Sequence, residues 1–203
     1  SALFPYFKPQ MLQNANVNIA KIAGEFVAMT ETPLPVRFDP NTLQTLGVLD
    51  YNDRLAKDDT FESAHPHHHA KRKEMWNYFI EFGRKSHYQI YAIPDGQSKR
   101  QIFCSLPVDR PAYMHSFSVT ERFFILVEYP FRVNPEDILL KPGGFISNFK
   151  WHPEEPAIFN VIERSTGKLL NKFEAPAFFS FHHVNAYEED ANLIVDLISY
   201  PDP

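Results

Sequence analysis

Several features are scarce in this 203-residue chain: it has one cysteine, no long apolar run and no long basic run. Cys104 alone cannot form an internal disulfide, which fits a reducing compartment and predicts a cytoplasmic location. Its neighbours, Phe103 and Ser105, belong to a strand-like run, so we expect a buried and unreactive thiol. No stretch approaches the roughly 18 apolar residues of a membrane-spanning helix.

Charge and the first residues exclude further classes of protein. The net charge is -5, and the basic run at residues 70–74 is short and of mixed sign. We interpret this run as a solvated loop, so no nucleic-acid partner is expected. Residues 1–5 lack the charged and apolar regions of a signal peptide, and we expect none there.

The residues that are abundant indicate a folded, aromatic-rich interior. Hydrophobic residues make up 44% of the chain and aromatic residues 15%, including 19 phenylalanines. This composition argues against disorder, and the length is sufficient for one sizeable domain with a real core. We therefore expect a single domain over residues 1–203.

Short apolar or alternating runs, separated by turn residues, predict an all-β fold. The predicted strands cover residues 17–22, 25–29, 88–93, 101–106, 122–129, 157–163, 178–181 and 193–199. One short helix is predicted at residues 134–140, with a proline near its start and acidic residues in its first turn. Two similar hairpins, at residues 36–43 and 161–168, favour the blades of a β-propeller, with a β-sandwich as the alternative.

Three separate segments each place a histidine in apolar or aromatic surroundings. They are Ala64–His67, Tyr113–Phe117 and Phe178–Glu189. Buried imidazoles need partners, and neutral nitrogen donors suit Fe, Zn, Cu and Ni better than Mg or Ca. The sequence thus indicates a metal site assembled from distant strands. Satisfied core or surface histidines are the alternative, and we favour that interpretation for His87 and His152.

Local geometry limits which histidines can meet. His182 and His183 are adjacent, so in a strand they point to opposite faces and one of them at most faces a shared centre. His65 and His67 can share a face in a loop at a strand end. A metal-bound imidazole usually donates its other N–H to a carboxylate. Glu31, at the end of an apolar strand, is the sharper candidate for that role, ahead of the pair at residues 188–189.

Together these segments resemble the carotenoid cleavage oxygenase family, which includes apocarotenoid oxygenases, β-carotene oxygenases and a retinoid isomerase. The match runs over essentially the whole chain, through Asn14–Asn18, Thr30–Thr32, Phe38–Leu43, Ala64–His67, Tyr113–Phe117 and Phe181–Glu189. The resemblance implies a seven-bladed β-propeller with Fe(II) on its axis, held by four histidines.

By their motifs, three of those ligands are His65, His115 and His182, with His182 favoured over His183. Glu31 matches a glutamate expected to accept a hydrogen bond from one ligand, His115. The family's enzymes are more than twice this length, and the fourth histidine lies outside this chain. The resemblance therefore implies an internal fragment of a larger propeller.

The activity implied by the resemblance is Fe(II)-dependent cleavage of a C=C bond by O2, giving two carbonyl products. The implied substrate is a long apolar polyene, a carotenoid or apocarotenoid, and Phe117, Phe149 and Phe179 are candidates for lining its tunnel. Core packing is the alternative for each of them. Residues 133–149 are a candidate apolar lip for peripheral membrane contact.

Other functions remain open at this point. Stilbene-cleaving members of the family are expected to carry a lysine where this chain has Thr30, which favours a carotenoid over a phenolic stilbene. The alternatives are a truncated or degenerate propeller that binds apolar ligands without catalysis and a zinc-dependent hydrolase. A zinc hydrolase normally has three protein ligands and a water, and Glu31 is the only candidate for its general base.

Overall fold

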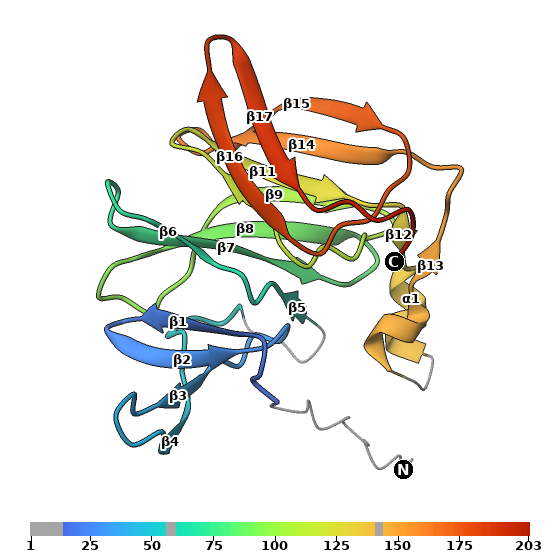
Figure 1. Cartoon of the computed structure of the whole chain (residues 1–203). Coiled ribbons are helices and arrows are strands. Elements are labelled where there is room, and N and C mark those ends of the chain that lie inside the picture. The colour runs from blue at the N-terminus through green and yellow to red at the C-terminus, as the bar shows by residue number, and fades with distance from the viewer. Residues whose placement is uncertain (1–13, 56–59, 141–143) are drawn as a thin grey trace.

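The computed structural model describes residues 14–55, 60–140 and 144–203, except for the side chains of residues 139–140. Strands dominate the described residues, with one α-helix and one 3-10 helix. The predicted all-β class is confirmed. Three antiparallel sheets follow one another in chain order, from the blue sheet at the bottom of Figure 1 to the orange one near the top.

The first sheet is a four-stranded meander in the order β1-β2-β3-β4. Its strands are β1 (Asn18–Ile22), β2 (Glu25–Met29), β3 (Val36–Phe38) and β4 (Thr45–Val48). Ala23 and Gly24 connect β1 to β2, and both have positive φ, at 53° and 84°. Two such residues form the tight turn whose twist matches that of the flanking strands.

The second sheet has five strands in the order β5-β7-β8-β9, with β6 also paired to β7. They are β5 (Thr60–Glu62), β6 (His67–His69), β7 (Glu74–Glu81), β8 (Ser86–Pro94) and β9 (Gln101–Val108). β5 and β6 pair with opposite ends of β7. The chain between them, residues 63–66, is therefore free of the ladder, and it carries His65.

The third sheet runs in the order β10-β11-β14-β15. Its strands are β10 (Ser118–Val119), β11 (Phe123–Glu128), β14 (Ala157–Glu163) and β15 (Lys168–Ala175). The connection from β11 to β14 contains β12 (Phe131–Arg132), α1 (Pro135–Leu140), η1 (Phe145–Asn148) and β13 (Lys150–Trp151). A last hairpin, β16 (His183–Glu189) and β17 (Asn192–Leu197), packs on this sheet.

The central strands of the second sheet, β7 and β8, are buried on both faces. Trp76 and Tyr78 of β7 point into the core shared with the third sheet, whereas Met75 and Phe79 point into the core shared with the first. Successive side chains of a strand alternate between faces, so one strand serves two cores. β7 consequently has no polar face, and its sequence shows no alternation of polar and apolar residues.

Most of the predicted elements are present. Residues 25–29 and 157–163 match β2 and β14, the helix is α1, and both predicted hairpins form. The strand predicted at residues 178–181 is wrong. In this segment Phe179 forms only an isolated bridge with Tyr200, and its apolar character reflects a side chain fully buried in the core. The regular strand begins at His183.

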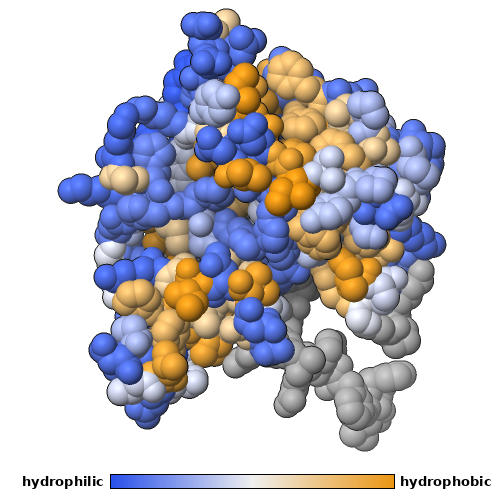
Figure 2. All heavy atoms as spheres, viewed as in Figure 1, coloured by the Kyte–Doolittle hydropathy of each residue, from blue (hydrophilic) through white to orange (hydrophobic). Residues whose placement is uncertain are grey.

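Figure 2 shows, among other apolar areas of the surface, two that lie over hairpins of the fold. One lies over the hairpin β16–β17, where Val184 is 66% exposed, and the other over the first sheet, where Ile19 is 62% exposed. A two-stranded hairpin is marginal without further packing. Its inner face supplies Ala186 and Val195 to the core, which is what holds it to the third sheet.

A buried cluster of charges joins the first two sheets. Arg100 Nη2 lies 2.7 Å from Asp53 Oδ1, and its Nη1 lies 3.6 Å from Glu62 Oε2, with all three side chains at most 5% exposed. The guanidinium lies 4.2 Å from the ring centre of Tyr51, whose hydroxyl donates to Glu62 Oε1. Two buried carboxylates thus depend on one cation.

Removal of that cation should be costly. We predict that Arg100→Met lowers the free energy of unfolding by about 3–5 kcal/mol, since it leaves two carboxylates buried without a counter-charge. Urea unfolding would measure the change. Lys71→Met, which breaks an exposed pair with Glu121, serves as the control and should leave the midpoint unchanged. An Arg100→Met midpoint equal to that of the control would contradict the prediction.

Candidate metal centre

The three candidate histidines occupy equivalent places in successive parts of the fold. His65 lies two residues before β6, His115 three residues before β10, and His182 directly before β16. Each stands in a non-ladder segment that leads into a strand with only one ladder partner. Because these strand starts lie side by side, segments far apart in sequence bring their imidazoles together.

The imidazoles converge at short range. The Nε2 atoms of His65 and His115 are 2.8 Å apart, and the ring centre of His182 lies 5.2 Å and 5.1 Å from those of the other two. One ring nitrogen from each histidine lies within 4.8 Å of the others. Two nitrogens bound at right angles to one ion, each at about 2.1 Å, are about 3.0 Å apart. The His65–His115 spacing therefore suits a shared ion.

The surroundings favour neutral imidazoles. Burial, reinforced by the neighbouring ring of His115, lowers the pKa of His65 to about 4. Burial and His115 lower the pKa of His182 as well. The neutral ring is the form that offers a lone pair to a metal, so at neutral pH these residues need not lose a proton to bind one.

Glu31 determines which nitrogen of His115 carries the proton. Its Oε1 lies 2.6 Å from His115 Nδ1 and also accepts a hydrogen bond of 2.8 Å from the hydroxyl of Tyr113. A carboxylate can only accept, so Nδ1 carries the hydrogen. In the neutral ring Nε2 then presents its lone pair, on the side where His65 lies. Glu31 and His115 are thus in contact, and the role of Glu31 at a metal centre stays a prediction.

The two other histidines near the cluster point elsewhere. His183 is turned into the core, where its Nδ1 lies 2.7 Å from Ser118 Oγ and its Nε2 lies 2.8 Å from the Tyr129 hydroxyl. His67 Nε2 lies 3.0 Å from the carbonyl oxygen of Phe117. Adjacent residues in an extended chain face opposite sides, which separates His183 from His182.

Among the described residues, no hydrogen bond joins the carboxylates at residues 188–189 to a ring nitrogen of the cluster. Glu188 instead accepts a hydrogen bond from Thr120 and pairs with Arg122.

The phenylalanines considered for a substrate tunnel lie in the core. Phe117 stacks on Phe124 with ring centres 4.4 Å apart, and Phe149 and Phe179 pack around Tyr113. All three candidates are at most 6% exposed in this chain. Their role in substrate binding remains a prediction.

Sequence reasoning missed two aromatic residues at the cluster itself. The ring of Phe181 stands edge-on to His115 at 5.6 Å, and it is 39% exposed. Tyr113 supports Glu31 through its hydroxyl. The signal for Tyr113 was its position two residues before His115, which places both on one side of an extended chain.

Residues 133–149 present little apolar surface among their described side chains. Val133 and Phe149 are buried, Phe145 stacks on Phe61 with ring centres 5.4 Å apart, and Ile146 is 48% exposed. Residues 141–143 and the side chains of residues 139–140 lie outside the described part. Neither described helix has the length or hydropathy to cross a membrane. Contact of this segment with a membrane surface stays a prediction.

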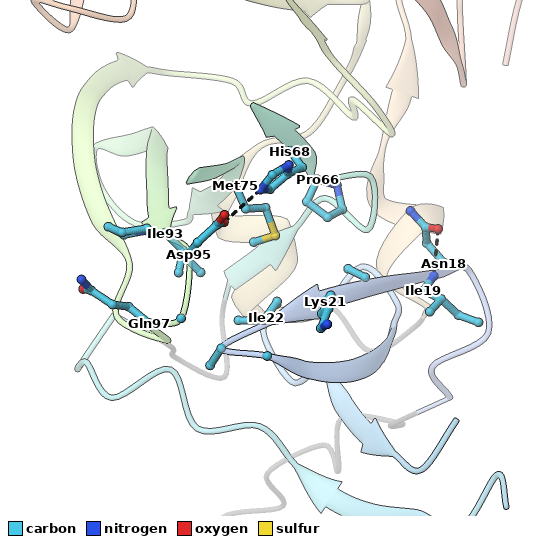
Figure 3. Close-up of a pocket in the computed structure, with 15 residues that line it drawn as sticks. Asn18, Ile19, Lys21, Ile22, Pro66, His68, Met75, Ile93, Asp95 and Gln97 are labelled. Carbon is cyan, nitrogen blue, oxygen red and sulfur yellow. Dashed lines mark hydrogen bonds and ion pairs between the residues drawn. The ribbon is translucent and has the colours of Figure 1, made fainter. Parts of the chain in front are cut away.

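Two other features were considered as sites. His152, Glu154 and Glu155 cluster on the surface, but Arg110 and Arg132 already pair with Glu155 and disfavour a cation there. A separate cavity of about 560 Å³ lies between β1 and the turn that follows β8 (Figure 3). Its lining includes Ile19, Lys21, Pro66, Met75 and the His68–Asp95 pair, and none of the three clustered histidines.

These observations define an all-β protein in which the second sheet, the third sheet and the last hairpin bring histidines to one candidate metal centre. A family model described as retinal pigment epithelial membrane protein matches residues 2–203. The chain belongs to the carotenoid cleavage oxygenase family, as its motifs predicted.

Named relatives support this assignment. The chain is 34% identical to human β,β-carotene 15,15′-dioxygenase and 30% identical to the chicken enzyme of that name, and each match covers 96% of this chain. A cobalt-substituted apocarotenoid oxygenase from Synechocystis is similar in structure, with a TM-score of 0.75, 26% identity and 92% coverage of this chain. The chain spans about 40% of the length of these relatives.

The buried His183 makes stability depend on pH. Burial, together with nearby His67, lowers its pKa to about 4, below the value of about 6.5 in an unfolded chain. Between these values the unfolded state binds the proton more readily, so stability falls as the pH drops. The free energy of unfolding should fall between pH 7 and pH 4.5 in both proteins. We expect this fall to be about 2–3 kcal/mol smaller in His183→Gln than in the unmodified protein. Urea unfolding at both pH values tests this, and an equal loss in the two proteins would contradict it.

Proposed function

We propose that this chain is part of an Fe(II)-dependent dioxygenase that cleaves a C=C bond of a carotenoid or apocarotenoid. Fe(II) would be held by His65, His115 and His182, with a fourth histidine from outside this chain, on the axis of a seven-bladed propeller. The observation that carries the proposal is the convergence of three imidazoles, with Glu31 fixing the proton of one of them. The names of the relatives support the substrate class.

The donor set fits the proposed ion. Three neutral nitrogens are suitable ligands for iron and leave its charge uncompensated in the inner shell. The cobalt in the similar Synechocystis structure supports a transition-metal site in this fold. Glu31 is engaged by both His115 and Tyr113. It is therefore not free to activate a water, which argues against a zinc hydrolase.

The roles of the residues follow from their contacts. Bound iron would supply a place where O2 meets one double bond of the substrate. Glu31 keeps the proton on His115 Nδ1, so that Nε2 remains a donor. Phe181, edge-on to His115, shields that ring from water. Phe117, Phe149 and Phe179 are proposed to form the wall of a tunnel once the rest of the protein is present.

Substrate class and location are part of the same proposal. Thr30 stands next to Glu31 and offers no cation to a phenol, which favours an apolar polyene over a stilbene. A polyene of this kind dissolves in membranes. We therefore propose a cytoplasmic protein that contacts a membrane surface peripherally through residues 133–149, where Ile146 is exposed.

Metal content and cleavage test the central claim. The protein should be expressed in the longest form its gene encodes, loaded with Fe(II), and given a β-apo-carotenal and O2. We expect stoichiometric iron and aldehyde products, and His115→Ala should abolish both. His87→Ala, a histidine of β8 outside the cluster, is the control and should retain both. Folded protein with neither iron nor products would instead favour a non-catalytic propeller that binds apolar ligands.

Glu31→Gln separates orientation from ligation. The glutamine keeps the shape but is a weaker acceptor, so the proton on His115 Nδ1 is held less firmly. We expect the affinity for Co(II) to fall about 10–100-fold, the range found when such outer partners are removed. Titration followed by visible absorption would measure it. Glu121→Gln, on the surface, should bind as the unmodified protein does, and equal affinity of Glu31→Gln would refute the proposed role.

A further inference from the structure

We infer that the hydroxyls of Ser63 and Ser116 are positioning devices that set the spacing of the three clustered histidines. The inference rests on the proposed metal centre and goes further, because it assigns the geometry of that centre to two side chains that never touch the ion. Both serines are buried, at 0% and 5% exposure.

Ser63 connects the backbones of two of the histidines. Its Oγ accepts a hydrogen bond of 3.2 Å from the N–H of His65 and donates one of 2.8 Å to the carbonyl oxygen of His115. His65 leads into β6 of the second sheet, and His115 leads into β10 of the third. One hydroxyl therefore fixes the distance between two histidines across a boundary between sheets.

Ser116 does the same for the third histidine. Its Oγ donates a hydrogen bond of 2.7 Å to the carbonyl oxygen of Phe181 and accepts one of 3.0 Å from the N–H of His183. These two groups flank His182 on either side. The residue next to His115 thus fixes the backbone on both sides of His182.

Strand pairing does not provide this connection. β6, β10 and β16 lie in different sheets, and the described residues contain no ladder that joins any two of them. The spacing between the histidines then depends on side chains that bridge the sheets. A hydroxyl suits this task because it donates and accepts at once, so it can join an N–H to a C=O.

The chain offers a matched control. Ser86 is 1% exposed, and its Oγ also accepts from an N–H and donates to a C=O, both belonging to Gly83 in a turn between β7 and β8. Ser86→Ala removes the same two kinds of hydrogen bond from a buried site without touching the histidine segments. A purely structural role for Ser63 and Ser116 predicts the same behaviour in all three alanine variants.

The experiment titrates Co(II) into the protein in the longest form its gene encodes and follows the visible d–d bands, with thermal unfolding of each variant alongside. We expect Ser63→Ala and Ser116→Ala to bind Co(II) about 10-fold more weakly and with shifted bands. Ser86→Ala should lose thermal stability but keep the affinity and spectrum of the unmodified protein. Ser63→Thr, which retains a hydroxyl, should recover the affinity.

Several outcomes would overturn the inference. Folded Ser63→Ala and Ser116→Ala variants with unchanged affinity and spectrum would show that the serines only stabilise the fold. Where an alanine variant fails to fold, the cysteine variant takes its place, because a thiol keeps the shape but is a weak donor. If the unmodified protein binds no cobalt, the proposed metal centre fails first and the inference fails with it.

Discussion

The rest of this structure depends on the packing of separate sheets against a second sheet whose central strands, β7 and β8, have no solvent-facing side. β7 and β8 place one set of side chains in each of two cores, so the first and third sheets are held apart at a fixed spacing by Trp76, Tyr78 and Phe79. Apolar packing of this kind fixes distance well but resists sliding poorly, because it is not directional. Hydrogen bonds at the starts of the strands are directional, and they fix how the sheets are aligned. Asn18 donates to the carbonyl oxygen of Ala64 and joins the first sheet to the segment that carries His65.

The fold could be read from the sequence where one face of a strand is solvated or a turn is distinctive. β2 and β14 were predicted with their observed bounds for this reason. The same reasoning fails in the middle of the molecule. β7 was not predicted because burial on both faces removes the alternation that identifies a strand. Phe178–Phe181 was mistaken for one because its apolar run reflects core contacts of Phe179, not a ladder.

The sequence predicted the histidines of the candidate site better than the residues that hold those histidines in place. Three imidazoles in apolar segments indicate a shared centre. The preference for His182 over His183 came from the family resemblance, since the alternation of side chains along an extended chain allows either residue to face that centre. The structure places His182 beside His65 and turns His183 toward Tyr129. The residues that hold the histidines, such as Ser63, left no signal, because a serine near a histidine is common and its partner lies about fifty residues away.

The electrostatics of the cluster follow from where the chain puts its carboxylates. Glu62 and Asp53 are buried, but they are committed to Arg100, on the other side of the second sheet from the third-sheet core. Glu31 is the acid that reaches a clustered ring, and it does so through Nδ1 of His115, on the side away from His65. The ring of His115 therefore separates the negative charge of Glu31 from the point where the lone pairs converge. An ion bound there would keep most of its positive charge.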